Sequence, residues 1–185
     1  MGIHLRNIAL TGALALAALP AAALPKGTSF SVDNIFYEVI SEADRTARIT
    51  SVNNKSKLPA NLVIDKVKYA RPVEGAEEEE FTVTEISAKA FSQAENIETL
   101  KVGNSVSTIG ESTFYCCTSL AKVELGSGLT ALANSLFSGC EALKEVDIAN
   151  GPESIGEWTF ADCPFTSINL PNSVRTIGDL SLIHI

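Results

Sequence analysis

The sequence repeats itself every 23 residues, and this period constrains the fold more than any other feature. The first apolar column contains Ile86, Ile109, Leu132, Ile155 and Ile177, at intervals of 23, 23, 23 and 22 residues. Five further columns keep the same register: Phe91, Phe114, Phe137 and Phe160; Ala94, Cys117, Cys140 and Cys163; Ile97, Leu120, Leu143 and Phe165; Leu100, Val123, Val146 and Ile168; and Val102, Leu125, Ile148 and Leu170. Six columns at a nearly fixed interval predict a chain built of structural repeats.

One unit of this length cannot fold alone. Its buried side chains stabilise it by about 1.5–3 kcal/mol each, whereas ordering its backbone costs about 1–2 kcal/mol per residue. Stacked units shelter each other, and the alternation at the end of each unit, as in Leu100-Lys101-Val102, is typical of a strand with one buried face. The sequence therefore predicts a solenoid whose strands pair as a parallel ladder. The segments rich in Gly, Ser, Ala and Glu predict turns or short helical segments on the other face.

Two segments carry a specific motif. "VSTIGESTFYCCTSLAKVEL" and "SIGEWTFADCPFTSINLPNSVRTIG" closely resemble the BspA-like class of leucine-rich repeat, with its pattern I-G-x-x-x-F-x-x-C-x-x-L-x-x-V-x-L-P. The resemblance covers roughly residues 81–179; Ser87 and Ala133 depart from it by replacing the glycine after the first column, and Pro152 interrupts another column. It implies an α/β leucine-rich-repeat solenoid with an N-terminal β-rich cap. It also implies a bacterial surface or secreted protein that acts by adhesion to other proteins. The residues themselves predict that the chain is not an enzyme, because no histidine lies between the two ends and no feature supplies a cleft for its carboxylates.

Residues 24–85 lack the period but contain β-rich segments. Residues 34–40 and 46–52 flank "SEAD" and predict a hairpin, and residues 61–65 and 81–86 predict further strands. An open solenoid end exposes its core and an unpaired edge, so we expect residues 24–85 to cap the repeats. Four repeats and the start of a fifth then occupy residues 86–179. The run Glu77–Glu80 is interpreted as a solvated loop, since it lacks the ligand spacing of a calcium site.

Both ends of the chain depart from the repeat. Residues 1–23 combine a short basic start, an apolar run and the small-residue site Ala21-Ala22-Ala23, which predicts a secretory signal peptide cleaved before Leu24. This favours a secreted or cell-surface protein with no membrane span after cleavage. "LSLIHI" (180–185) breaks the pattern and matches the translation of a common sequencing adaptor, so we interpret it as a non-native tail. An uncapped last repeat predicts self-association through the C-terminal end.

Charge and composition exclude several functions. Between the two ends, residues 24–179 carry 13 basic and 22 acidic side chains, a net charge of −9, which disfavours nucleic acid as a partner. The two histidines, His4 and His184, lie outside this range. Residues 24–179 therefore cannot form a Ser-His-Asp or Cys-His catalytic site. No cofactor and no metal site is predicted.

Three of the four cysteines share a repeat column. Ala94 fills the same position in the first repeat, which favours a small buried side chain over a thiolate. Ala94, Cys117, Cys140 and Cys163 are therefore interpreted as a structural column. A disulfide between neighbouring cysteines and a metal or catalytic role remain alternatives. Cys116 lies in a column with Gln93, Gly139 and Asp162, and it is the thiol that we expect to react.

The outward residues of the ladder are the candidate binding site. They are Glu98, Thr99, Lys101, Lys122, Glu124, Lys144, Glu145, Asp147, Ser167 and Asn169. Glu124 and Asp147 share a column and resemble an acid pair, but lysines lie beside them, and catalytic carboxylates need a partly desolvated cleft. Two functions follow: recognition of an extracellular or cell-surface protein through this face, or a structural spacer that presents a C-terminal domain absent from this sequence.

Overall fold

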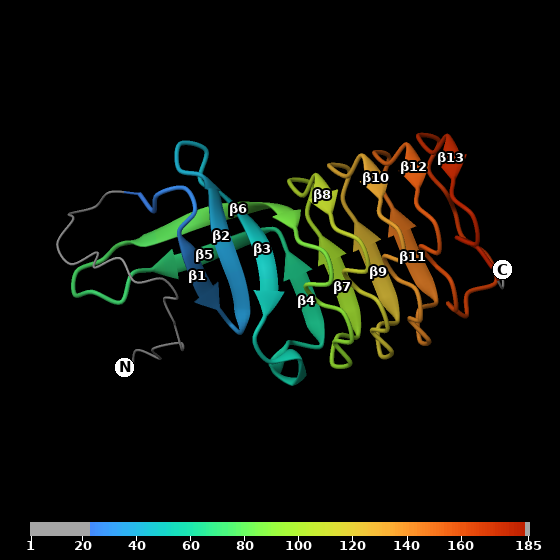
Figure 1. The fold of residues 1–185 in the computed structure, drawn as a ribbon, viewed down its shortest axis with the longest axis horizontal. Coiled ribbons are helices and arrows are strands. Elements are labelled where there is room, and N and C mark those ends of the chain that lie inside the picture. Colours follow the sequence, from blue (N-terminus) through green and yellow to red (C-terminus); the bar gives the residue numbers. More distant parts are fainter. Residues whose placement is uncertain (1–22, 184–185) are drawn as a thin grey trace.

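The computed structural model describes residues 23–183 and has two regions along one axis. A twisted β-sheet lies at the N-terminal end, and a regular stack of turns continues from it to the C-terminal end (Figure 1). Of the predicted signal peptide only Ala23 lies within the described residues. The described chain contains no helix long and apolar enough to cross a bilayer.

The N-terminal sheet is mostly antiparallel. Its strand order is β1-β2-β3-β6-β5, and β8 pairs with the far end of β6. The strands are β1 (Ser29–Val32), β2 (Ile35–Ser41), β3 (Thr46–Val52), β5 (Lys66–Ala70), β6 (Glu78–Ile86) and β8 (Thr108–Ile109). The β2–β3 hairpin around "SEAD" confirms the predicted one, and the strand predicted at residues 81–86 forms the end of β6. β1 and β5 were not predicted.

The interpretation of Glu77–Glu80 as a loop was wrong for three of its four residues. Glu78, Glu79 and Glu80 lie in β6 and pair with β5, whose two lysines contact Glu78 and Glu80. Lys66 Nζ lies 2.7 Å from Glu80 and Lys68 Nζ 3.4 Å from Glu78. Opposite charges across an antiparallel pair stabilise strands even where β-propensity is low, so the partner strand gives the glutamates a place in the sheet.

The predicted parallel ladder is present. It contains β4 (Asn61–Ile64), β7 (Thr99–Val102), β9 (Lys122–Leu125) and β11 (Glu145–Ile148), in the order β4-β7-β9-β11. Equivalent residues of successive repeats pair directly, as Leu100 with Val123 and Val123 with Val146. A second row of two-residue strands runs beside it: β10 (Ala131–Leu132), β12 (Ser154–Ile155) and β13 (Thr176–Ile177). Figure 1 shows the two rows side by side along the solenoid.

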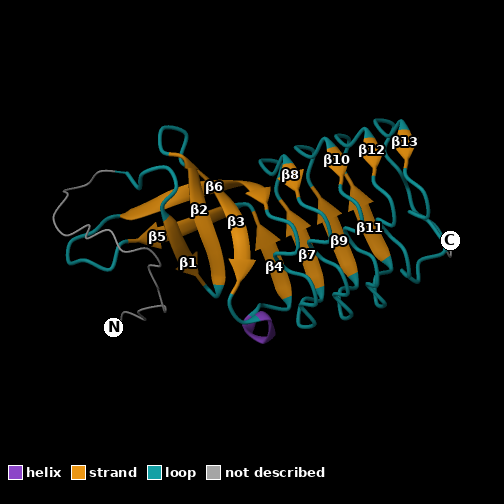
Figure 2. Cartoon of the chain, in the orientation of Figure 1, coloured by secondary structure: helices purple, strands orange, loops and turns teal. Residues whose placement is uncertain are grey.

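Turns connect these strands, and within residues 23–183 the single helix is a 3-10 turn, η1 (Lys55–Lys57), ahead of the repeats (Figure 2). The turns recur with the sequence period because the same positions adopt left-handed backbone conformations. Ser112, Ser135 and Trp158 have φ near +55°, and so have Lys89 and Leu180 in the flanking units. A residue in the left-handed conformation lets the chain reverse its direction within a short turn. Each 23-residue repeat therefore closes through turns and contains no helix.

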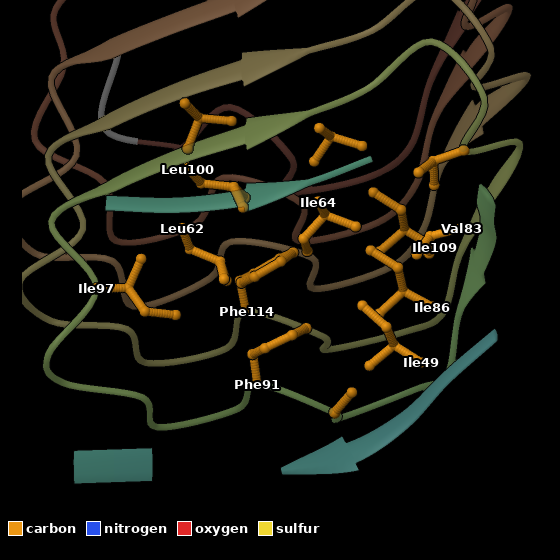
Figure 3. Close-up of a cluster of buried hydrophobic side chains, with 14 of the residues drawn as sticks. Ile49, Leu62, Ile64, Val83, Ile86, Phe91, Ile97, Leu100, Ile109 and Phe114 are labelled. Carbon is orange, nitrogen blue, oxygen red and sulfur yellow. The ribbon is translucent and has the colours of Figure 1, made fainter. Parts of the chain in front are cut away.

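The core lies between the two rows of strands and the turns (Figure 3). Phe91, Phe114, Phe137 and Phe160 are each fully buried and stack, with ring centroids 5.3–5.6 Å apart and planes within 11°. Their environments are equivalent, as the constant interval predicts. The repeat architecture expected from the sequence is therefore the architecture of the molecule.

The N-terminal region contributes rungs to the same columns. Ile49 of β3 pairs with Ile86, and Leu62 and Ile64 of β4 pair with Leu100 and Val102. All three lie in the core that extends through the repeats. Residues 24–85 thus continue the ladder at its N-terminal side; their role as a stabilising cap stays a prediction.

The last described residues follow the pattern of the preceding turn. Leu180 takes the same left-handed conformation as Trp158, and Ser181 is buried as Thr159 is. The backbone N–H of Phe160 donates to the carbonyl of Ser181 over 3.0 Å. The backbone of Leu180 and the burial of Ser181 thus repeat those of Trp158 and Thr159, and the boundary of the repeats at Asp179 stays a prediction. The non-native origin of residues 180–185 stays a prediction.

Candidate functional site

The ladder brings six of the ten candidate face residues onto one regular surface. They are Thr99, Lys101, Lys122, Glu124, Glu145 and Asp147, two from each of β7, β9 and β11. They alternate with buried core residues, because successive side chains of a strand point to opposite faces. Their backbones are in register, so Lys101 lies beside Glu124 and Glu124 beside Asp147.

Ion pairs connect these side chains across the strands. Glu124 lies 3.2 Å from Lys101 Nζ and 3.6 Å from Lys122 Nζ, and Lys122 Nζ lies 3.5 Å from Glu145. The side chains are 39–70% exposed, so each pair contributes little to stability. The surface is consequently a solvated array of both charges, with an order that the strand register imposes.

The electrostatics do not suit the carboxylate pair to acid catalysis. Hydrogen bonding to Lys101, reinforced by its charge and that of Lys122, lowers the pKa of Glu124. A general acid needs the opposite shift, which desolvation in a cleft provides. Glu124 and Asp147 lie opposite each other, as predicted, on an open sheet where Lys101 and Lys122 favour the ionised form of Glu124.

The other four candidates lie beside the sheet. Glu98 and Lys144 immediately precede β7 and β11 and are exposed. Ser167 and Asn169 are exposed too, but the predicted fourth repeat strand is absent, and residues 163–170 are irregular. Pro164 cannot donate a ladder hydrogen bond, and this unit is one residue shorter than the others. Ser167 and Asn169 therefore do not continue the ordered array.

The structure adds residues that the sequence reading did not assign to the face. β4 extends the sheet at its N-terminal edge, where the Thr99 hydroxyl donates to Asn61 Oδ1 over 2.7 Å. Val63, the neighbour of Lys101, is 64% exposed and is an apolar side chain beside the charged array. "NLVID" indicated a strand, but its distance of 38 residues from β7 concealed its place in the ladder.

The cysteine column is buried and contains no disulfide. Cys117, Cys140 and Cys163 are free, and each thiol donates to the carbonyl of a phenylalanine in the preceding repeat, over 3.2–3.3 Å. Burial raises the pKa of Cys117 to about 11 and that of Cys163 to about 12, and it raises that of Cys140 further. Nucleophilic and metal-binding cysteines need the opposite, a stabilised thiolate. Among residues 23–183 no group of three or more potential ligands is arranged to hold a metal.

Cys116 lies in the turn of its repeat and has a structural role there. It adopts a left-handed conformation with φ of 53°, as do Gln93 and Asp162 at equivalent positions. Its thiol lies over Gly139 of the next repeat, where an added Cβ would come within 2.8 Å of Cys116 Sγ. Gly139 leaves room for this sulfur and also has positive φ. Partial exposure keeps Cys116 the thiol from which we expect reaction.

The fold and the repeated turns define a leucine-rich-repeat solenoid. The sequence profile of the BspA type leucine rich repeat region matches residues 78–183 in six copies, and the chain belongs to this family. No curated protein matches the chain.

Solved structures of bacterial leucine-rich repeat proteins are similar. One from T. pallidum is 26% identical with a TM-score of 0.64, and the match covers 80% of this chain and 63% of that protein. One from Bacteroides ovatus is 26% identical with a TM-score of 0.65, covering 82% and 38%. One from Bacteroides capillosus is 26% identical with a TM-score of 0.59, covering 82% and 97%. The chain thus spans less than two thirds of the first two proteins.

Proposed function

We propose that the chain is a non-catalytic recognition module that binds an extracellular or cell-surface protein through the outward face of β4, β7, β9 and β11. The observation that carries the proposal is the ordered array of opposite charges on this face, with Val63 exposed at its edge. Membership in a bacterial leucine-rich-repeat family supports protein binding and a location outside the cytoplasm. Adhesion is the specific form of binding that we propose.

The physical basis is complementarity over an extended sheet. Three parallel strands place charges at intervals of about 4.8 Å along the solenoid and about 7 Å along each strand. A partner with matching opposite charges replaces the exposed intramolecular pairs at little cost, because those pairs are weak. Such surfaces determine specificity and association rate more than affinity, and several repeats in one plane add their contributions.

The test is binding of the immobilised protein to a panel of extracellular-matrix and cell-surface proteins. Lys122→Glu reverses a charge at the centre of the array, where Lys122 contacts Glu124 and Glu145. We expect it to weaken binding about tenfold or more. Lys89→Glu is the matched control, since Lys89 is exposed in a turn away from the ladder. Equal loss from both variants, or no partner for the unaltered protein, contradicts the proposal.

The internal pairing of these charges favours a second function, a structural spacer. Lys101, Lys122, Glu124 and Glu145 already satisfy one another, as they need to in a sheet that faces only water. A spacer requires a stiff stack and no partner on this face. Unchanged adhesion by Lys122→Glu in the intact surface protein, together with unchanged stability, supports the spacer over the binding module.

A further inference from the structure

The chain becomes fixed to the fold at Leu24. The Leu24 side chain is 1% exposed and belongs to the core of the N-terminal sheet. A turn follows directly, in which the N–H of Thr28 donates to the carbonyl of Pro25 over 3.0 Å and Gly27 has a φ of +83°. The N–H of Gly27 then donates to the carbonyl of Val39 in β2 over 2.8 Å. From Leu24 onward the backbone has one defined path into β1.

The backbone nitrogen of Leu24 points at a carboxylate. It lies 3.4 Å from Glu79 Oε2, and the other oxygen of Glu79 lies 3.7 Å from Arg71 Nη2. The side chains of Glu79 and Arg71 are only 13% and 15% exposed. The distance to Leu24 is long for a hydrogen bond of a neutral amide, yet it lies within the range of an ion pair. Glu79 therefore contacts the Arg71 guanidinium with one carboxylate oxygen and the backbone nitrogen of Leu24 with the other.

The surroundings favour a positive charge at the same place. A pocket of about 370 Å³ opens beside Ala23, and its lining includes Arg45 and Arg71 but four glutamates, Glu74, Glu77, Glu78 and Glu79. The lining thus carries an excess of negative charge. The Tyr69 hydroxyl is buried and has no hydrogen-bond partner within the described residues, and the charges of Arg71 and Glu79 both act on it. A cation next to Glu79 reduces the imbalance.

We propose that the exported protein begins at Leu24 and that its free α-ammonium group forms an ion pair with Glu79 that locks the N-terminal sheet. The Ala23–Leu24 peptide bond is hydrolysed by an export peptidase that selects small residues one and three positions before the cut. Water supplies the second oxygen of the Ala23 carboxylate, and its two hydrogens end as protons on the Leu24 nitrogen, which becomes an ammonium group. Because Leu24 is buried in the folded protein, the cut precedes folding. Cleavage thus creates the α-ammonium charge of Leu24, which then pairs with Glu79 when the protein folds.

The first test is the N-terminus of the product. The full 185-residue protein is produced in a bacterium that exports it, and the mature form is identified by intact mass and N-terminal peptide analysis. We expect a chain that begins at Leu24. A mature chain that begins at any other residue overturns the proposal.

The second test measures the ion pair as a coupling. The folding equilibrium constant is determined for a chain that begins at Leu24 and for one with Gly-Ser ahead of Leu24, each with Glu79 and with Glu79→Gln. Since a hydrogen bond to a charged group contributes more than a neutral one, we expect the extension to lower the constant about tenfold with Glu79 and to have little effect with Glu79→Gln. Glu80→Gln is the control, because Glu80 pairs with Lys66 on the exposed side of β6 and does not line the pocket. An equal effect of the extension in all three backgrounds overturns the proposal.

A chain that begins at Leu24 and carries an Nα-acetyl group keeps the test decisive if Glu79→Gln does not fold. The acetyl group removes the charge and leaves every side chain in place. We expect the same tenfold loss. Equal stability of the acetylated and free forms overturns the lock, whatever the outcome for adhesion.

Discussion

Side chains of the N-terminal region stack in the same core columns as those of the repeats, but their spacing along the sequence is different. In the repeats, Ile86, Leu100 and Ile109 follow one another at 14 and 9 residues. In the N-terminal region, Ile49 and Leu62 are 13 residues apart, but 24 residues separate Leu62 from Ile86. The extra residues form β5 and most of β6, which pair with each other. Residues 49–64 are thus a repeat in structure whose period is hidden by an inserted hairpin.

This difference teaches where stability comes from in each region. A repeat contacts its two neighbours through stacked columns, so its stability is a sum of nearest-neighbour terms. The N-terminal sheet contains a local antiparallel core around Phe30, Tyr37, Tyr69 and Phe81, whose rings lie 4.6–5.4 Å from that of Phe30. We expect the two regions to lose their structure separately when each is damaged.

The largest effect is expected from removing a ring in either core. Phe114 and Phe30 are both fully buried, and truncation of each to alanine should cost about 3–5 kcal/mol of unfolding free energy. Phe114→Ala interrupts the stack between Phe91 and Phe137, and we expect hydrogen exchange to accelerate in β7, β9 and β11 while β1–β3 remain protected. Phe30→Ala should accelerate exchange in β1–β3 first.

Hydrogen exchange followed by mass spectrometry measures both variants, with chemical denaturation giving the free energies. Uniform acceleration through residues 24–183 in Phe114→Ala would show a single cooperative unit. That result would remove the comparison between the regions.

The two adjacent cysteines give a smaller effect on the repeat side. Cys117→Ala removes a buried thiol and its hydrogen bond to the Phe91 carbonyl, and should cost about 1 kcal/mol, since Ala94 fills this position in the first repeat. Cys116→Ala should cost less than about 0.5 kcal/mol, because Cys116 is partly exposed in a turn. Alkylation of the native protein should modify Cys116 alone.

The thiol of Cys117 also predicts a pH dependence. Its folded pKa of about 11 exceeds the ordinary value of 9.0, so the folded state keeps a proton that the unfolded state releases. The associated stability is complete below the ordinary pKa and is lost as pH rises from about 9 towards 11. We measure the free energy of unfolding by chemical denaturation at several pH values across this window. It should fall less steeply with rising pH for Cys117→Ala than for Cys116→Ala. Equal slopes would contradict the assigned burial.

The sequence predicted the repeats because each position there has one environment that recurs. The repeated apolar residues in the columns of Ile86 and Phe91 indicate buried positions, and the alternation around Lys101 indicates which strand residues face solvent. It did not predict the ladder position of β4 or the pairing of Glu79 with Arg71, because both depend on contacts across an insertion that has no period. The missing strand at Ser167 follows from Pro164, a local exception that a column alignment passes over.

The smallest effect on stability is expected at the C-terminal end of the first column. Ile109 is 3% exposed between β6 and the next turn, whereas Ile177 in β13 is 47% exposed, with no strand on its outer side within the described residues. Ile177→Lys should therefore change the unfolding free energy by less than about 0.5 kcal/mol, while Ile109→Lys buries a charge and should prevent stable folding.

We propose that the exposed edge of β13, together with Leu180 at 44% exposure, mediates self-association of this chain. Sedimentation velocity should then show a concentration-dependent dimer for the unaltered protein and a monomer for Ile177→Lys. A monomer in both cases would show that the two ends of the stack are equally protected, the N-terminal one by β3 and β4 and the C-terminal one by its last turn.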